Sequence, residues 1–204
     1  ELHGLLQMKL KLPPEIGVNL PNLEGIYMAQ NYLYGLIPNL LRNASRIQAL
    51  DLSANGFQAS TVSLLQLTST IRYPRGIENY RNLMVLSLHS NSFHSIIHSS
   101  LEILTKLERL SLNQNMFFGD IPEKFGNLSK LYEIIAEYNQ FSAKIPKSIM
   151  FCKRLAILDL VGNRLDGNIP KEIFELSDLR ASWTSANKAE GRARKSTSAS
   201  IIQS

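Results

Sequence analysis

Cysteine is nearly missing from this sequence, since Cys152 is the only one among 204 residues. No two cysteines can pair in a disulfide within the chain or form a Cys-x-x-Cys motif for a metal or a redox reaction. The local sequence Phe151-Cys152-Lys153 supplies no base that would activate a thiol. We therefore expect Cys152 to be a small core residue placed just before a strand.

Long apolar runs are also absent. The sequence has no stretch of about 18 apolar residues, so we expect no membrane span within it. It has no basic start followed by an apolar core and a small-residue cleavage site, so no signal peptide is visible. If a longer protein is secreted or bound to a membrane, those segments lie outside these residues.

Catalytic motifs are missing as well. The sequence has no glycine-rich phosphate loop, no His-Glu-x-x-His motif and none of the protein kinase motifs. His89, His94 and His98 are close in sequence, but the segment is not helical and they fall at different points of a strand and turn. We expect surface or turn histidines rather than a zinc site. No catalytic residue, metal or cofactor is expected.

The net charge of +5 is concentrated at the C-terminal end. After Leu179 the only acidic residue is Glu190, and the basic residues there are Arg180, Lys188, Arg192, Arg194 and Lys195. The rest of the chain is therefore close to neutral and is not expected to be a basic surface. A polar, basic tail of this composition is expected to be disordered, and we expect no nucleic-acid partner.

Six asparagines recur along the chain with gaps of 24, 36, 24, 24 and 24 residues: Asn31, Asn55, Asn91, Asn115, Asn139 and Asn163. A fixed period of this length indicates a solenoid. One frame surrounds them, seen whole in Leu155-x-x-Leu158-x-Leu160-x-x-Asn163-x-Leu165-x-Gly167-x-Ile169-Pro170. Its alternating leucines predict a half-buried strand. Each Asn amide is expected to satisfy buried backbone groups at the strand exit and to bond the next coil.

The frame resembles the plant-specific leucine-rich repeat, LxxLxLxxNxLxGxIPxxLGxLxx, over about residues 12 to 179. The resemblance implies an α/β-type repeat solenoid with a parallel concave β-sheet and a convex side of 3-10 helices and loops. The segment from Leu12-Pro13-Pro14-Glu15-Ile16-Gly17 to Leu20-Pro21-Asn22-Leu23 narrows it further. It is similar to ectodomains of the receptor-like kinases that sense flagellin and elongation factor. Ectodomains of this class usually have paired-cysteine caps, so with one cysteine we expect a fragment.

Three regions are expected: a degenerate N-terminal repeat (1–22), the solenoid (23–178) and the basic tail (179–204). The solenoid is irregular at 59–74, because twelve extra residues separate Asn55 from the next proline turn. Either a loop was inserted or a coil lost its strand half, and the Leu64-Leu65-Gln66-Leu67 sequence favours the second. We expect a convex bulge or an irregular joint, with no regular strand between residues 55 and 83. No further frame follows Leu179.

The outward slots of the strands form the expected binding face, because repeat proteins of this shape bind partners there. Its most distinctive part is Arg109 beside Glu133, Glu137 and Tyr138, flanked by Asp159. Charged anchors with an aromatic ring suit an extended peptide or protein loop. The alternative is a solvated face whose charges neutralise one another. The full predicted set is Tyr27, Gln30, His89, Arg109, Asn113, Glu133, Glu137, Tyr138 and Asp159.

The sequons Asn43-Ala44-Ser45 and Asn127-Leu128-Ser129 fall in one convex slot and are candidate glycosylation sites in a secreted protein. The resemblance implies a non-catalytic module that perceives an extracellular peptide or protein, in defence or development, outside the plasma membrane. The resemblance also implies a co-receptor as a further partner. Two alternatives stay open. The chain could be part of a receptor Ser/Thr kinase whose catalytic domain lies elsewhere, or a truncated or decoy repeat protein.

Overall fold

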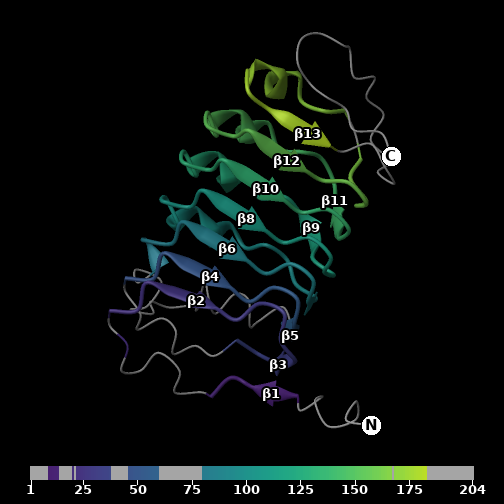
Figure 1. The fold of residues 1–204 in the computed structure, drawn as a ribbon. Helices are drawn as coiled ribbons and strands as arrows, with labels where there is room; N and C mark the ends of the chain where they lie inside the picture. The colour runs from purple at the N-terminus through teal and green to yellow at the C-terminus, as the bar shows by residue number, and fades with distance from the viewer. Residues whose placement is uncertain are drawn as a thin grey trace.

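A computed structural model describes residues 9–13, 20, 22–37, 46–59, 80–166 and 168–182. Its main feature is a stack of coils that each contribute one strand to a parallel sheet (Figure 1). This sheet has seven strands: β2 (Gly25–Tyr27), β4 (Ala49–Asp51), β6 (Val85–Ser87), β8 (Arg109–Ser111), β10 (Glu133–Ile135), β12 (Ile157–Asp159) and β13 (Arg180–Ser182). The expected parallel solenoid of leucine-rich repeats is confirmed.

Two smaller parallel sheets and a row of 3-10 helices complete the coils. One sheet joins β1 (Leu10–Lys11), β3 (Leu33–Gly35), β5 (Gly56–Ala59) and β7 (Ser92–Phe93); the other joins β9 (Phe118–Asp120) and β11 (Gln140–Ser142). An isolated parallel bridge pairs Ile96, three residues after β7, with Phe118 of β9. The helices are η3 (Ser99–Ile103), η4 (Glu123–Asn127), η5 (Lys147–Phe151) and η6 (Lys171–Glu175). Proline directly precedes the last three, where its fixed φ suits the start of a helix.

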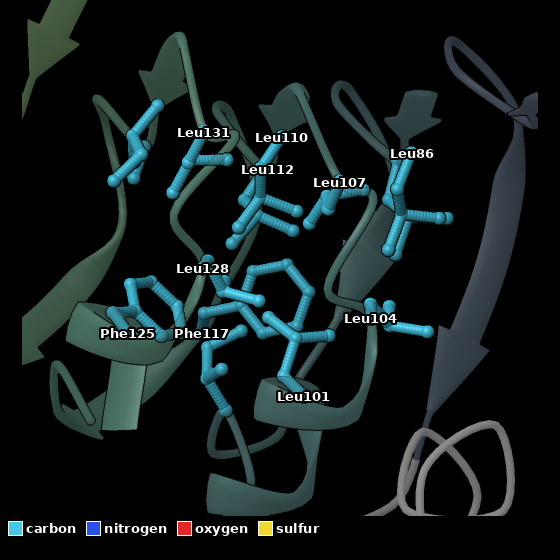
Figure 2. Close-up of a cluster of buried hydrophobic side chains, with 14 of the residues drawn as sticks. Leu86, Leu101, Leu104, Leu107, Leu110, Leu112, Phe117, Phe125, Leu128 and Leu131 are labelled. Carbon is cyan, nitrogen blue, oxygen red and sulfur yellow. The ribbon is translucent and has the colours of Figure 1, made fainter. Parts of the chain in front are cut away.

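The core is filled from both walls of the coils. Phe57, Phe93, Phe117 and Phe141 are at most 2% exposed and occupy the same frame slot. The Phe93 and Phe117 rings stack with centroids 5.8 Å apart, and those of Phe117 and Phe141 lie 6.2 Å apart. Figure 2 shows Leu86, Leu110 and Leu112 beside the strands and Leu101 and Phe125 beside the 3-10 helices, all in one cluster with Phe117. Each coil therefore buries its apolar face only against its neighbours, as expected for a solenoid.

The asparagines form the expected ladder, but those from Asn55 to Asn163 reach back to the preceding coil rather than on to the next. Asn163 Nδ2 donates to the carbonyl of Ala136 in the preceding coil (2.9 Å) and to that of Leu160 in its own (3.1 Å). Asn163 Oδ1 accepts the Phe141 amide at 3.0 Å. Asn139 and Asn115 repeat these bonds. The amide thus satisfies backbone groups at the exit turn of the preceding coil.

The extra twelve residues after Asn55 do not separate β4 from β6 in the large sheet. β4 pairs directly with β6, Ala49 opposite Val85. The ladder also crosses this joint, since Asn91 Nδ2 donates to the Leu52 carbonyl at 2.9 Å and the Phe57 amide donates to Asn91 Oδ1 at 3.0 Å. Residues 60–79 lie outside the described residues, so the choice between an inserted loop and a lost strand stays open.

Two expected boundaries are wrong. No strand was expected between residues 55 and 83, yet β5 follows directly after Asn55. It forms because β3 beside it offers unpaired backbone groups. β13 extends the sheet past residue 178 by pairing Arg180 with Ile157, an offset of 23 rather than 24 residues. Such pairing needs backbone groups and no leucine, so the missing frame did not reveal it. Residues 183–204, most of 1–22 and the Asn43 sequon lie outside the described residues.

Candidate functional site on the concave face

The sheet register places the predicted binding residues in rows across the coils. Glu133 lies opposite Arg109 on one side and Ile157 on the other. Arg109 is exposed and Glu133 is partly buried. The two are neighbours as expected, yet they form none of the ion pairs shorter than 4 Å found in the described part of the chain. The pair therefore presents separate charges rather than a closed salt bridge.

Glu137 is the electrostatic centre of the site. Asn113 Nδ2 donates to Glu137 Oε1 at 3.4 Å from the preceding coil, and Asp159 approaches from the following one. Partial burial raises the pKa of the Glu137 carboxyl, the negative charge of Asp159 raises it further, and the Asn113 hydrogen bond opposes the shift. The geometry thus concentrates negative charge between two coils. A cationic group of a ligand would relieve that charge.

Tyr138 covers the glycine of the next coil. Its side chain is 57% exposed. A Cβ added to Gly162 would lie 2.6 Å from Tyr138 Cδ1, so the ring rests where a side chain would stand. At the other end of the face, a Cβ on Gly25 would lie 2.6 Å from Tyr27 Cε2. The sequence interpretation missed this packing, for which a glycine in an outward slot was the available signal.

Backbone conformation aims the residues at the strand exit. The residue before each ladder asparagine has a positive φ: Gln30, Ala54, Ser90, Gln114, Tyr138 and Gly162. Five of the six are not glycine, which is uncommon for residues with a Cβ. The predicted binding residues Gln30 and Tyr138 therefore leave the sheet from a left-handed turn that the leucine pattern did not predict.

The remaining predicted residues lie apart from the cluster formed by Glu137, Tyr138 and Asp159. His89 Nδ1 is 3.1 Å from Ser90 Oγ, and Ser90 Oγ donates to Gln114 Oε1 at 2.8 Å. Tyr27 is 75% exposed, four coils before Tyr138. With strands about 4.8 Å apart, roughly 19 Å separates the two rings' coils. An extended segment of about six residues would span it at about 3.3 Å each.

Asp159 and its counterpart Asp51 also stabilise their own turns. Asp51 Oδ1 accepts the Ser53 amide at 3.0 Å and the Ser53 hydroxyl at 2.6 Å. Asp159 Oδ1 accepts the Val161 amide at 3.1 Å. These local bonds are typical of aspartate at a turn. Asp159 therefore contributes charge to the site while one of its oxygens is occupied.

The other candidate positions lie away from the face. Asn127 is exposed at the end of η4, and its Nδ2 donates to Glu102 Oε2 at 2.6 Å. Among the histidines, His94 packs against the Phe118 ring at 4.9 Å. Among the residues that the structure describes, no three His, Cys, Asp or Glu side chains are grouped to hold a metal ion, and no helix is both long and apolar enough to cross a membrane.

Comparison with known proteins supports the repeat class and names similar folds. Residues 106–128 and 154–176 match the Leucine Rich Repeat family. The chain is similar to PEPR1 in the PEPR1–AtPEP1 crystal structure (32% identity, TM-score 0.74, 88% of this chain and 23% of that one). It is also similar to the HAESA ectodomain from Arabidopsis with an IDA peptide hormone (26% identity, TM-score 0.74, 89% of this chain and 29% of that one). A third similar structure is Pollen Receptor Kinase 3 (26% identity, TM-score 0.70, 84% of this chain and 77% of that one). The comparison with curated proteins gave no match.

The chain is a leucine-rich-repeat solenoid, and its similar structures include ectodomains of plant receptor kinases. It spans about a quarter of the length of PEPR1 and HAESA. A second HAESA structure contains both its peptide hormone and the co-receptor SERK1. The fold itself is non-catalytic in these ectodomains.

Proposed function

We propose that this chain binds a peptide on its concave face, as part of the ectodomain of a receptor kinase at the outer side of the plasma membrane. The observation that carries the proposal is the cluster of Glu137, Asp159 and the Tyr138 ring that rests on Gly162. The peptide complexes of PEPR1 and HAESA support it by similarity. A co-receptor would bind the longer parent protein, as SERK1 does HAESA.

The chemistry of the face defines the ligand more closely. Glu133, Glu137 and Asp159 outnumber the cations of the face, Arg109 and the Arg180 that lies opposite Ile157. A ligand with a lysine or arginine opposite Glu137 would neutralise it, and the exposed Tyr138 ring would pack on the aliphatic stem or attract the cation. The leucine–proline segment at residues 12–23 leads us to place the parent among receptors that sense flagellin or elongation factor in defence. The parent would be a Ser/Thr kinase by its catalytic domain.

Selection from a random peptide library on the immobilised chain would test the proposal. We expect the selected peptides to be rich in basic residues. Glu137→Ala and Tyr138→Ala should each weaken them at least about tenfold, since truncated anchor residues at an interface commonly cost that much. Glu123→Ala on the exposed start of η4 is the matched control. Peptides whose affinity changes in neither concave variant would contradict the site.

Glycosylation offers a separate test of the extracellular placement. When the chain is secreted from plant cells, we expect a glycan on Asn127, which lies exposed on η4. Asn127→Gln and Ser129→Ala should each remove the same mass. A secreted chain with an unmodified Asn127 would contradict the expectation at this position.

A further inference from the structure

The repeats are nearly neutral in sum, but exposed cations gather along one side of the large sheet. This side, which we call the start edge, is formed by the N-terminal ends of the strands, at the tails of the arrows in Figure 1. Each cation there stands one or two residues before the leucine or isoleucine that opens a coil, and all are exposed. This start-edge row consists of Arg46, Arg81, Lys106, Lys130, Lys153 and Arg154. The expectation that the repeats present no basic surface is therefore wrong for this edge.

The start-edge row forms no ion pair with any residue that the structure describes. Within the ranges that the structure describes, the ion pairs shorter than 4 Å are Lys124–Glu102 and Lys147–Glu172, neither of which involves the row. The adjoining column contributes only two acids, Glu24 and Glu108. Because the coils stack about 4.8 Å apart, the cations form a line along the solenoid and reinforce one another's field.

A hollow of about 360 Å³ lies at one end of this row. Cations from two coils line it, together with an amide of the coil between them. Lys106 Nζ donates to Asn82 Oδ1 at 2.7 Å. The full lining is Glu24, Arg46, Gln48, Asn82, Met84 and Lys106. The lining holds two cations against the single carboxylate of Glu24, so it stays net positive. Its cations, two amides and one apolar side chain suit an acidic sugar, whose carboxylate, hydroxyls and ring need those contacts.

We propose that the start-edge row and its hollow bind a linear carboxylated polysaccharide. The Arg46 guanidinium and the Lys106 ammonium bind one uronate carboxylate, and Gln48 and Asn82 hydrogen-bond sugar hydroxyls. The polymer continues along Lys130 and Arg154. A row one residue wide suits a single polymer chain better than a membrane plane. Single-stranded nucleic acid needs stacking platforms, and Tyr132 is the one aromatic ring in the adjoining column of described residues.

The probe is an oligogalacturonate, with its methyl ester as the uncharged control, and binding to the whole chain is measured by calorimetry. We expect the double variant Arg46→Gln/Lys106→Gln to weaken binding at least about tenfold, and added salt to weaken it further. The matched control is Lys144→Gln/Arg164→Gln, which removes one lysine and one arginine exposed elsewhere. Circular dichroism of each variant verifies the fold. The variants Glu137→Ala and Tyr138→Ala should bind the oligomer normally, so peptide and sugar binding can fail separately.

Several outcomes would overturn the proposal. Equal affinity for the oligogalacturonate and its methyl ester would show that the carboxylate charge does not contribute to binding. Equal losses in both double variants would show attraction by net charge alone. Binding of single-stranded DNA or anionic vesicles, with none of the oligogalacturonate, would assign the row to a different partner.

Discussion

The ring of Tyr138 occupies the space that a side chain at position 162 would fill. A Cβ on Gly162 would lie 2.6 Å from Tyr138 Cδ1, and Gly162 itself has φ of +68°. Both residues precede a ladder asparagine, in consecutive coils, and both adopt the left-handed conformation. The concave face is therefore shaped by a contact between two coils, and not by one residue alone.

Gly162→Ala should displace the Tyr138 ring and destabilise the protein. The backbone alone tolerates alanine in this turn, because Ala54 has φ of 50° in the same slot. The expected loss of about 1–3 kcal/mol therefore comes mainly from the ring, as for other overpacked sites. Thermal unfolding would measure it. When Tyr138 is already alanine, no ring fills the space, so adding Gly162→Ala should cost much less stability than it does in the wild type. Equal losses from Gly162→Ala with and without the ring would contradict the contact.

The asparagine ladder should contribute unequally along the chain. Asn163 is 3% exposed and bonds three carbonyls and the Phe141 amide. Asn163→Ala leaves those groups buried without a partner, so we expect a loss of about 2–4 kcal/mol. Asn31 is exposed, and among the described residues it bonds Met28 and Ala29 of its own coil, so Asn31→Ala should cost less than about 1 kcal/mol. Urea unfolding compares the two. Similar losses would show that the inter-coil bonds contribute little.

The leucine and asparagine periods predicted the strands, the core and the outward face, because one frame fixes which side chains turn inward. They did not predict β5 or β13, since both form by backbone pairing with a neighbouring strand, whatever their side chains. The left-handed residue before each asparagine was missed for a similar reason. Glutamine, alanine, serine and tyrosine all occupy that slot, so no residue type marks it.

The binding face could be predicted as a set of residues but not as a set of contacts. The frame gives the slot of each side chain, whereas the Asn113–Glu137 bond and the Tyr138–Gly162 packing depend on how two coils stack. The start-edge row was missed because the net charge was summed along the chain. Its cations align only when the coils are superposed in space.

Glu137 should make stability depend on pH in an unusual direction for a carboxylate. Its pKa is raised above the ordinary 4.5 by burial and then by Asp159. The folded protein therefore holds a proton that the unfolded chain releases more readily, and the stabilisation is complete below about pH 4.5 and lost as the pH rises through the raised pKa. Glu137→Gln removes this dependence. The free energy of unfolding of the variant, compared with that of the wild type, should therefore be higher at about pH 7 than at about pH 4.

Urea unfolding midpoints at both ends of that range would measure the change. Glu123→Gln, at the exposed start of η4, is the matched control and should show a smaller change. If the difference between Glu137→Gln and wild type is the same at both pH values, Asp159 and burial do not act on Glu137 as described.

Cys152 should resist alkylation until the solenoid opens. It is fully buried, its Sγ donates to the Phe125 carbonyl at 3.2 Å, and burial raises the pKa of the thiol to about 11. At pH 8 only about one thiol in a thousand would be ionised, and the thiolate is the reactive form. Mass spectrometry after iodoacetamide treatment would follow the reaction. The same chain in urea should react at the rate of an ordinary thiol. Fast labelling of the folded chain would show instead that η5 opens readily and that the convex wall near Cys152 is loosely packed.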